Sequence, residues 1–348
     1  MAAIPGPNEI YVMNPTLVEI TRGGLIESAH RGAIAIADAA GGLRAAWGDT
    51  DQPVFPRSAF KSLQALALVE TGAAHAFDVS EEELALACAS HSGEPMHTQR
   101  VNAWLDRIGC KDGNLACGPH LPFHEPTAHA LIREGQQPCR VHNNCSGKHT
   151  GFLTLARHLN VSIEGYERPD HPVQVVVRET IANLCDVSAH TLPIGIDGCA
   201  APNYAIPLQR LAQAMARLGD TASLAPSRAS AAKRVLKAWK SHPSLVSGTG
   251  RACADLIEAS TGQTVVKTGA EGVFMAVLPE QGLGIALKID DGASRAAEAV
   301  MARLLALLGV ASESAPAIAK HLNPHIRNWR GDIVGARRTT AALAKLEL

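Results

Sequence analysis

The stretch Arg57-Ser58-Ala59-Phe60-Lys61, at the start of a long apolar run, organises the rest of this sequence. Residues three apart share a face of a helix, so the side chains of Ser58 and Lys61 can meet if the run is helical. A serine hydroxyl needs a neighbouring base to become a nucleophile, and a lysine can be that base when burial or a nearby cation lowers its pKa. The pair is therefore the smallest local unit that could carry out acyl transfer.

The same spacing also occurs where no chemistry is expected, at Ser230 and Lys233 in a segment rich in lysine and arginine. A second segment supports the first copy, because Val265–Gly269 is a β-branched run that ends in Lys-Thr-Gly. Serine β-lactamases and penicillin-binding proteins combine Ser-x-x-Lys, Ser-Asp-Asn and Lys-Thr-Gly in that order. Here the first and third motifs are present in the right order, and the middle one is absent.

Composition excludes several classes of protein. The chain has 348 residues, 46% of them hydrophobic and 19% charged, which is typical of a globular protein with a substantial core. A net charge of −1 argues against a nucleic-acid partner, and no apolar run is long enough to span a membrane. The N-terminus has neither a basic segment nor an apolar signal core, so we expect a cytoplasmic protein whose eight cysteines are thiols.

Periodicity predicts strands near both ends of the chain and helices between them. Strands are expected at 17–21, 32–38, 43–47, 264–267, 272–278 and 283–289. Helices are expected near 147–158, 171–185, 207–219, 227–241, 249–260 and 292–308. The order predicts an α+β fold, a mixed and mainly antiparallel sheet flanked by helices, with a helical subdomain.

We expect one catalytic domain over residues 1–348. Its sheet should come from about 8–55 and 262–348, and its helical portion from about 56–261. Residues 117–145 are rich in Pro, His and Asn and predict an irregular loop with one short helix. Such loops hold functional sites more often than core, so this segment is a candidate for part of the site.

The segment Asn143–His149 is the densest polar cluster in the chain. It lacks the upstream glycine of a phosphate-binding loop and has His149 in place of Ser or Thr, which argues against nucleotide binding. Cys145 and His149, with Cys199 further along and Lys148 on the same turn, could gather around zinc. An N-capping loop with a buried thiol explains the same residues, and spacing alone favours it because no regular zinc signature is met.

Two further groups of residues have both a functional and an ordinary explanation. Ser90 and His91 could be a nucleophile and its base, or hydroxyl and ring groups that bond to carbonyls at a helix end. Arg57 and Asp197 could bind the carboxylate and the ammonium of a small zwitterion, or be an exposed arginine and a turn-forming aspartate. The segment Gly248–Cys253 lacks the third glycine of a dinucleotide fingerprint and predicts a turn that starts a helix.

Taken together, five motifs in order resemble those of the rhizobial-type (class 3) L-asparaginases, over nearly the whole chain. They are Arg57-Ser-Ala-Phe-Lys61, Ala89-Ser-His-Ser-Gly-Glu94, Asn144-Cys-Ser-Gly-Lys-His149, Ile196-Asp-Gly-Cys199 and Val266-Lys-Thr-Gly-Ala-Glu-Gly272. The resemblance implies a serine β-lactamase or penicillin-binding-protein-like fold. It also implies an amidohydrolase that converts L-asparagine to L-aspartate and ammonia.

The resemblance assigns roles by motif. Ser58 matches the nucleophile with Lys61 as its base, and Ser90 matches a partner serine near Lys267. In the resulting mechanism, the positive charge of Lys267 keeps the pKa of Lys61 low. The residues leave open whether Ser58 or Ser90 attacks first, because both can share one hydrogen-bonded network.

The resemblance also implies a metal site and a partner. Cys145, Lys148 and Cys199 match zinc ligands, and the resemblance implies that zinc tunes substrate binding more than it performs chemistry. Substrate binding is expected at Arg57, Asp197 and His149. The family tends to form homodimers, which the sequence itself does not establish.

Two alternatives remain from the residues alone. One is a cytosolic β-lactamase-like amidase or peptidase, which the missing Ser-Asp-Asn disfavours. The other is a non-catalytic sensor that binds zinc or an amino acid through Cys145 and Cys199. Turnover of L-asparagine separates both from an asparaginase.

Overall fold

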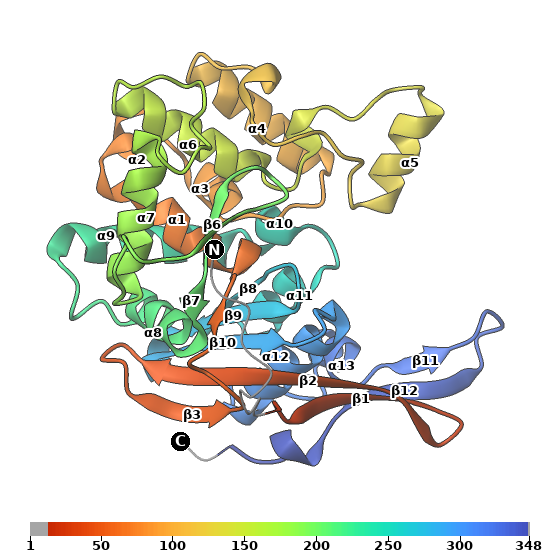
Figure 1. Cartoon of the computed structure of the whole chain (residues 1–348). Helices are drawn as coiled ribbons and strands as arrows, with labels where there is room; N and C mark the ends of the chain where they lie inside the picture. Colours follow the sequence, from red (N-terminus) through yellow and green to blue (C-terminus); the bar gives the residue numbers. More distant parts are fainter. Residues whose placement is uncertain (1–12, 347–348) are drawn as a thin grey trace, which may run out of the picture.

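An eight-stranded antiparallel sheet, assembled from both ends of the chain, lies below a helical region in the view of Figure 1. This computed structural model describes residues 13–346. The strand order is β11-β12-β1-β2-β10-β9-β8, with β3 paired to β2. These strands are β1 (Thr16–Arg22), β2 (Leu25–Asp38), β3 (Leu43–Trp47), β8 (Val265–Thr268), β9 (Val273–Leu278), β10 (Leu283–Ile289), β11 (His325–Arg327) and β12 (Ile333–Thr339).

Helices cover both faces of the central strands. Strand β9 is buried along its whole length, so neither face is open to water, and its β-branched and aromatic residues suit that environment. Helix α8 (Leu208–Gly219) packs on β2, β9 and β10, and α12 (Ser294–Leu307) packs on β1, β9 and β10. The sheet is therefore a rigid base on which the end of β8 is held.

The helical region is built around α1 (Lys61–Glu70), which is buried from Lys61 to Leu68. A helix that is buried on every side belongs at the centre of its layer. The other helices are α2 (Ala73–Ala76), α3 (Glu81–Ala87), α4 (Pro95–Arg107), α5 (Glu125–Arg133), α6 (Ser146–His158), α7 (Pro172–Leu184), α9 (Pro226–Ser241), α10 (Pro243–Ser247), α11 (Ala252–Ala259) and α13 (Pro316–Leu322). Because Lys61 begins the central helix, its amine lies in the protein interior.

Two small antiparallel sheets join the helical region to the rest. Strand β4 (Pro53–Val54) pairs with β7 (Ile206–Pro207), and β5 (Ile194–Ile196) pairs with β6 (Pro202–Tyr204). The second pair positions the turn that follows Ile196, where Asp197 and Cys199 lie.

The predicted α+β architecture, with its sheet drawn from the two chain ends, is confirmed. Every strand pair among residues 13–346 is antiparallel, so the sheet has no parallel part there. Strand β2 starts at Leu25, before the predicted 32–38, because it continues directly from the Gly23-Gly24 turn. The predicted start of the sheet near residue 8 lies outside the described residues.

One end of the sheet extends beyond the helices as an arm formed by the β1–β2 and β11–β12 hairpins (Figure 1). The first residues of β2 are exposed, whereas its later residues are buried in the body of the sheet. No helix among residues 13–346 is both long enough and apolar enough to cross a bilayer.

Candidate active site

Ser58 lies on a turn of 3-10 helix and not on the α-helix that the sequence predicted. The turn covers Arg57–Phe60, and α1 begins only at Lys61. Lys61 lies one residue beyond this turn, and its amine bonds to Ser90, Cys145 and the Ala89 carbonyl oxygen. Arg57 has a left-handed φ of +52°, a strained conformation for a residue with a side chain.

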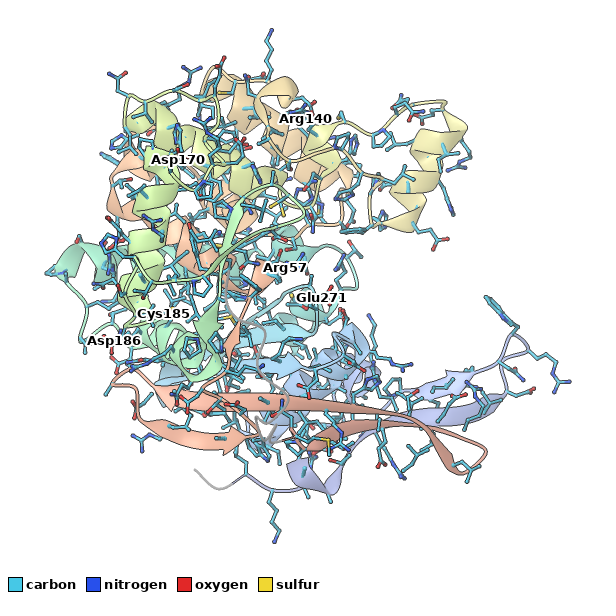
Figure 2. All side chains as sticks on the ribbon, viewed as in Figure 1. Arg57, Arg140, Asp170, Cys185, Asp186 and Glu271 are labelled. Carbon is cyan, nitrogen blue, oxygen red and sulfur yellow. The ribbon has the colours of Figure 1, made fainter. Side chains whose placement is uncertain are left out.

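The Lys-Thr-Gly segment lies directly against this turn. A Cβ added at Gly269 would be 2.5 Å from the carbonyl oxygen of Pro56, so only glycine allows this close approach. Glu271, two residues further on, also has a left-handed φ, of +59°. Figure 2 shows Arg57 and Glu271 at the junction of the helical region and the sheet, with Asp170 and Arg140 farther out in the helical region.

Ser90 is the serine that the structure holds between two lysines. Lys61 Nζ donates to Ser90 Oγ at 3.0 Å, and Lys267 Nζ lies 2.9 Å from the same oxygen. Lys61 also donates to Cys145 Sγ at 3.1 Å and to the carbonyl oxygen of Ala89. No hydrogen bond joins Ser58 Oγ to any residue in the range 13–346. Ser90 thus contacts both lysines, whereas no hydrogen bond among the described residues joins Ser58 to Lys61, the pair that the sequence predicted.

Burial lowers the pKa of Lys267 to about 7, and the charges of Lys61 and Arg251 act in the same direction. Cys253 opposes this effect only in part. A lysine with this pKa is partly neutral near neutrality and can accept a proton. Burial thus favours the neutral form of Lys267, whereas the sequence-based mechanism treated this lysine as the positively charged partner of Lys61.

His91 does not serve as a base for Ser90 in this arrangement. Its Nδ1 accepts a hydrogen bond from the Gly93 N–H at 3.2 Å, so the ring proton lies on Nε2 and is donated to Ser146 Oγ at 2.8 Å. The ring is fully buried and stacks on His97, and burial lowers the pKa of His91 well below its usual value. His91 is therefore a neutral structural residue.

An open pocket of about 240 Å³ adjoins the Ser58 turn. Its lining includes Arg57, Ser58, Ala270, Asp197, Cys145 and Cys199. Ser90 and the amines of Lys61 and Lys267 are not part of the lining, and each of these three residues is buried. Ser58 is thus the serine that a molecule in the pocket can reach.

Arg57 and Asp197 bind one another across the pocket wall. Arg57 Nε and Nη2 lie 2.8 and 2.7 Å from Asp197 Oδ1. Burial alone would raise the pKa of Asp197, but the charges of Lys148 and Arg57 outweigh it and lower the pKa. The sequence predicted that Arg57 and Asp197 bind opposite ends of a zwitterion. In the structure, the two side chains form an ion pair with each other.

The three predicted metal ligands lie together. Lys148 Nζ donates to Cys199 Sγ at 3.0 Å, and the hydrogen bond between the two thiols lowers the pKa of Cys199 while raising that of Cys145. Burial alone would lower the pKa of Lys148, but the two sulfurs outweigh it and raise the pKa. Within residues 13–346, no group of three or more His, Cys, Asp or Glu side chains could hold a metal ion, so a site here needs Lys148 as the third donor. Two soft sulfurs and an amine are a donor set that fits zinc.

His149 differs from its expected role in substrate binding. The ring is fully buried, and its Nδ1 accepts a hydrogen bond from the Tyr166 hydroxyl at 2.7 Å. That hydroxyl in turn accepts from the Ala116 N–H at 2.8 Å. Burial lowers the pKa of His149 to about 3. The structure uses His149 in the core of the helical region, and the pocket lining does not include it.

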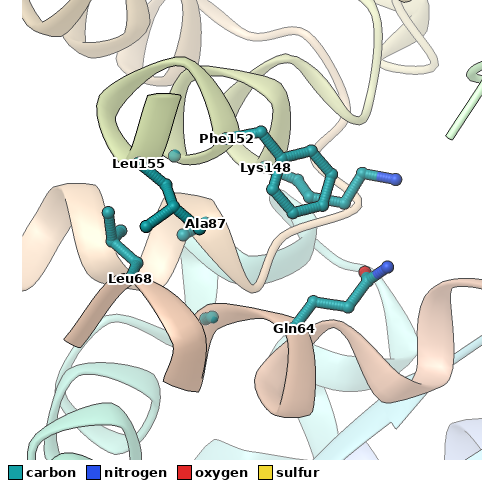
Figure 3. Close-up of a pocket in the computed structure, with 8 residues that line it drawn as sticks. Gln64, Leu68, Ala87, Lys148, Phe152 and Leu155 are labelled. Atoms are coloured by element: carbon teal, nitrogen blue, oxygen red, sulfur yellow. The ribbon is translucent and has the colours of Figure 1, made fainter. Parts of the chain in front are cut away.

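A small cavity of about 10 Å³ lies between α1 and α6, with room for one water molecule. Gln64 and Lys148 line it, and Figure 3 shows their amide and amine groups ending on the same side. Gln64 Oε1 is buried and has no hydrogen-bond partner among the described residues. Gln64 lies three residues after Lys61, just as Lys61 lies three residues after Ser58. This spacing could have identified Gln64 as a polar residue on the same face of the helix.

The pocket also contains residues that the motifs did not indicate. His120 and Phe123 line it, and their rings stack with centroids 4.7 Å apart. His120 Nε2 accepts a hydrogen bond from the Asn144 N–H at 3.0 Å, which connects this loop to the segment that leads into α6. Both rings lie in the irregular loop predicted over 117–145, but no spacing rule identified which of its side chains enter the site.

In this fold, Ser58 lines a pocket beside a buried network of Ser90, Lys61 and Lys267. The family model described as L-asparaginase II matches residues 18–339. The chain belongs to the L-asparaginase II family and is an amidohydrolase of the L-asparaginase type, which confirms the family prediction from the motifs.

Solved structures of low sequence identity were also found. A β-lactamase from Mycobacterium bovis is 14% identical, with 79% of this chain and 94% of that chain covered and a TM-score of 0.41. Unliganded simvastatin synthase from Aspergillus terreus is 11% identical, with coverages of 74% and 87% and a TM-score of 0.36. An octameric penicillin-binding protein homologue from Pyrococcus abyssi is 14% identical, with coverages of 86% and 80% and a TM-score of 0.33. No curated protein matches the sequence significantly.

Proposed function

We propose that the chain hydrolyses L-asparagine to L-aspartate and ammonia through an acyl-enzyme formed on Ser58. The observation that carries the proposal is the position of Ser58, which lines the pocket next to a buried network of two lysines and a second serine. Ser58 Oγ attacks the side-chain amide carbon, the C–N bond breaks and ammonia leaves. Water then hydrolyses the resulting ester and releases aspartate.

Proton transfer is assigned to the Ser90 network. Lys267, with a pKa of about 7, supplies a neutral amine, and Lys61 Nζ donates hydrogen bonds to Ser90 Oγ, Cys145 Sγ and the Ala89 carbonyl oxygen. In the proposed step, Lys61 takes the Ser58 proton as it passes one of its own to Ser90 Oγ, and the Ser90 hydroxyl proton moves to the neutral amine of Lys267. In this proposal, Lys61, three residues after Ser58, is the base for Ser58, and Lys267 is the final proton acceptor.

Two backbone N–H groups are suited to stabilise the negative oxygen that forms during attack. Ser58 and Ala270 both line the pocket, and neither N–H donates to an acceptor among residues 13–346. Gly269 brings their segments into contact. Fixed donors aimed at one oxygen typically contribute about 10²- to 10³-fold to the rate.

Ammonia release from L-asparagine by the purified protein tests the proposal, with L-glutamine and Ser58→Ala measured beside it. We expect release from L-asparagine that the substitution abolishes. Full activity in Ser58→Ala would exclude Ser58 as the nucleophile. Absence of release by the wild type, with and without added zinc, would contradict the asparaginase reaction itself.

We further propose that Cys145, Lys148 and Cys199 hold a zinc ion that tunes substrate binding. The support is their convergence on the pocket wall and the lowered pKa of Cys199, which makes a thiolate ligand available. Asp197 shares this wall, so a bound cation would alter the charge around the Arg57–Asp197 pair. When bound, the ion supplies a fixed positive charge beside the pocket.

Zinc titration against a chelator tests this site without reference to activity. Cys199→Ser should weaken zinc affinity by more than about 10²-fold, because one of the two soft thiolate ligands is lost. Cys185→Ser is the matched control, since Cys185 is also a buried thiol but lies at the end of α7 and outside the proposed ligand set. Equal affinity in the wild type and Cys199→Ser would contradict the assignment.

The compartment and the assembly are also proposals. All eight cysteines are free thiols, which supports a cytoplasmic enzyme. The arm carries exposed apolar residues at Leu25, Ile26, Trp329 and Ile333, and a hairpin arm with so much exposed apolar surface supports a homodimer. Trp329→Asp should shift the sedimentation of a wild-type dimer to that of a monomer, whereas a wild-type monomer would contradict the proposal.

A further inference from the structure

The pairing of Arg57 with Asp197 leaves one end of an amino-acid substrate without an obvious partner. L-Asparagine carries an α-carboxylate and an α-ammonium besides its side-chain amide. If the ammonium approaches Asp197, the carboxylate needs a cation, and the guanidinium of Arg57 is already bound to Asp197 through Nε and Nη2. A second guanidinium near the pocket would complete the recognition of both charges.

Arg251 is such a group. Its side chain is half-buried and makes no hydrogen bond or ion pair with any residue from 13 to 346. The guanidinium lies over the ring of Phe123, with the carbon atom Cζ 5.6 Å from the ring centroid. Phe123 lines the same pocket as Ser58 and Asp197. The charge of Arg251 also acts on Lys267, which places it within electrostatic reach of the Ser90 network.

The backbone that carries Arg251 is held rigidly against the Ser90 loop. The Thr249 N–H and hydroxyl donate to Glu94 at 2.9 and 2.8 Å, and Ser92 Oγ donates to the same carboxylate at 2.6 Å. Gly248 has a φ of +112°, and a Cβ there would be 2.0 Å from Ser92 Oγ. A rigid support of this kind fixes a binding group at low entropic cost.

We propose that Arg251 binds the α-carboxylate of L-asparagine, while Asp197 receives the α-ammonium and Ser58 faces the side-chain amide. Arg251 is then a specificity-determining residue that selects amides bearing an α-carboxylate. The proposal rests on the proposed asparaginase reaction. It gives a function to the Gly248–Cys253 segment, whose sequence predicted only a helix-start turn.

The test compares L-asparagine with β-alaninamide, which is asparagine without its α-carboxylate. In Arg251→Gln, kcat/KM for L-asparagine should fall about 10- to 100-fold, mainly through KM, because one charged hydrogen-bonded pair is lost. The value for β-alaninamide should stay near that of the wild type. Arg251→Lys should recover part of the loss, because it restores the charge without the planar fork.

Binding provides a second measurement that needs no turnover. Calorimetric binding of both amides to Ser58→Ala and to the double variant Ser58→Ala/Arg251→Gln should show a selective loss for L-asparagine. Arg57→Gln is the matched control, and a selective loss in Arg57→Gln alone would assign the carboxylate to Arg57 and overturn the proposal.

Other outcomes distinguish a failure of the Arg251 proposal from a failure of the proposed asparaginase reaction. Equal losses for both amides in Arg251→Gln would show a purely structural role, and no loss would show a solvated surface arginine; both overturn the proposal. A wild-type protein that neither binds nor hydrolyses L-asparagine would contradict the proposed reaction, on which this inference depends.

Discussion

The surroundings of Ser58 and Ser90 differ in almost every physical respect. Ser58 is on a strained 3-10 turn, faces an open pocket, and its hydroxyl bonds to none of the described residues. Ser90 is buried, bonds to two lysines, and lies on a loop fixed by the Val246 and Asn144 carbonyls. One serine is accessible and unbound, and the other is inaccessible and firmly held.

Because their surroundings differ, we expect Ser58 and Ser90 to have different roles although each belongs to a predicted Ser-Lys pair. A nucleophile must be free to reach a carbonyl, and a proton-transfer group must be held in a fixed geometry. Strain at Arg57 and the close approach of Gly269 keep Ser58 at the pocket surface. Burial around Lys267 lowers the pKa of this lysine to about 7, so its amine is partly neutral at neutral pH.

The largest expected effects come from replacing each serine in turn, which tests whether Ser58 and Ser90 have different roles. Ser58→Ala should lower kcat by about 10⁴-fold or more, because the attacking atom is lost. Ser90→Ala should lower it by about 10²-fold, because the lysines remain but lose their shared partner. Steady-state ammonia release measures both, and an acyl-enzyme mass should appear in Ser90→Ala but not in Ser58→Ala. The reverse order would exchange the two roles.

The next prediction concerns pH. Burial lowers the pKa of Lys267 from 10.5 to about 7, so its neutral, proton-accepting form is lost as the pH falls through 7. Activity should therefore rise with pH through about 7 and level off above it. Lys267→Met should lower kcat by about 10²- to 10⁴-fold and remove this step from the pH–rate profile.

Lys233→Met is the control for this substitution, because Lys233 belongs to the other Ser-x-x-Lys copy and is exposed on α9. It should leave both the rate and the profile unchanged. A wild-type profile that falls with rising pH through 7 would contradict a neutral Lys267 as base.

The smallest expected effect comes from the contact that keeps the Ser58 turn in place. Gly269→Ala would put a Cβ 2.5 Å from the Pro56 carbonyl oxygen, so the turn or the strand end must shift. We expect a loss of about 1–3 kcal/mol in the free energy of unfolding, as for overpacking, and a decrease of about 10-fold in kcat.

Gly113→Ala is the matched control, because a Cβ at Gly113 meets no atom within 4 Å. Thermal unfolding and ammonia release measure the two effects. Wild-type values for Gly269→Ala would show that the close approach does not position Ser58.

Much of the fold followed from local patterns. The α+β order was predicted from alternating residues at the two chain ends and from helical apolar periodicity between them. These patterns are informative because the spacing of apolar residues reflects which face of a strand or helix is buried. The arm strands β11 and β12 were not predicted individually, because β11 has only three residues and β12 is mostly half-buried, with no regular apolar alternation. The 3-10 turn at Ser58 was missed because its geometry depends on the contact with Gly269.

The candidate site divides in the same way. The motifs identified both serines, both lysines and the two thiols with Lys148, and the structure brings Ser90 to both lysines and Lys148 to Cys199. The motif could not show that the His149 ring is buried, because it gives a residue's position in the chain and not the direction of its ring. His120 and Phe123, which line the pocket, and Arg251, which lies over the Phe123 ring, were missed because they come from segments without a recognisable spacing.

By itself, the sequence determined the order of elements, the chemical groups available and the family that the motifs resemble. Only the tertiary structure decided which groups are partners. Lys267 and Ser90 are separated by 177 residues, and Arg57 and Asp197 by 140, yet each pair is in hydrogen-bond contact. Contacts of this range, and the burial that lowers the pKa of Lys267, arise only when distant segments pack together, because solvent exposure is a property of the whole fold.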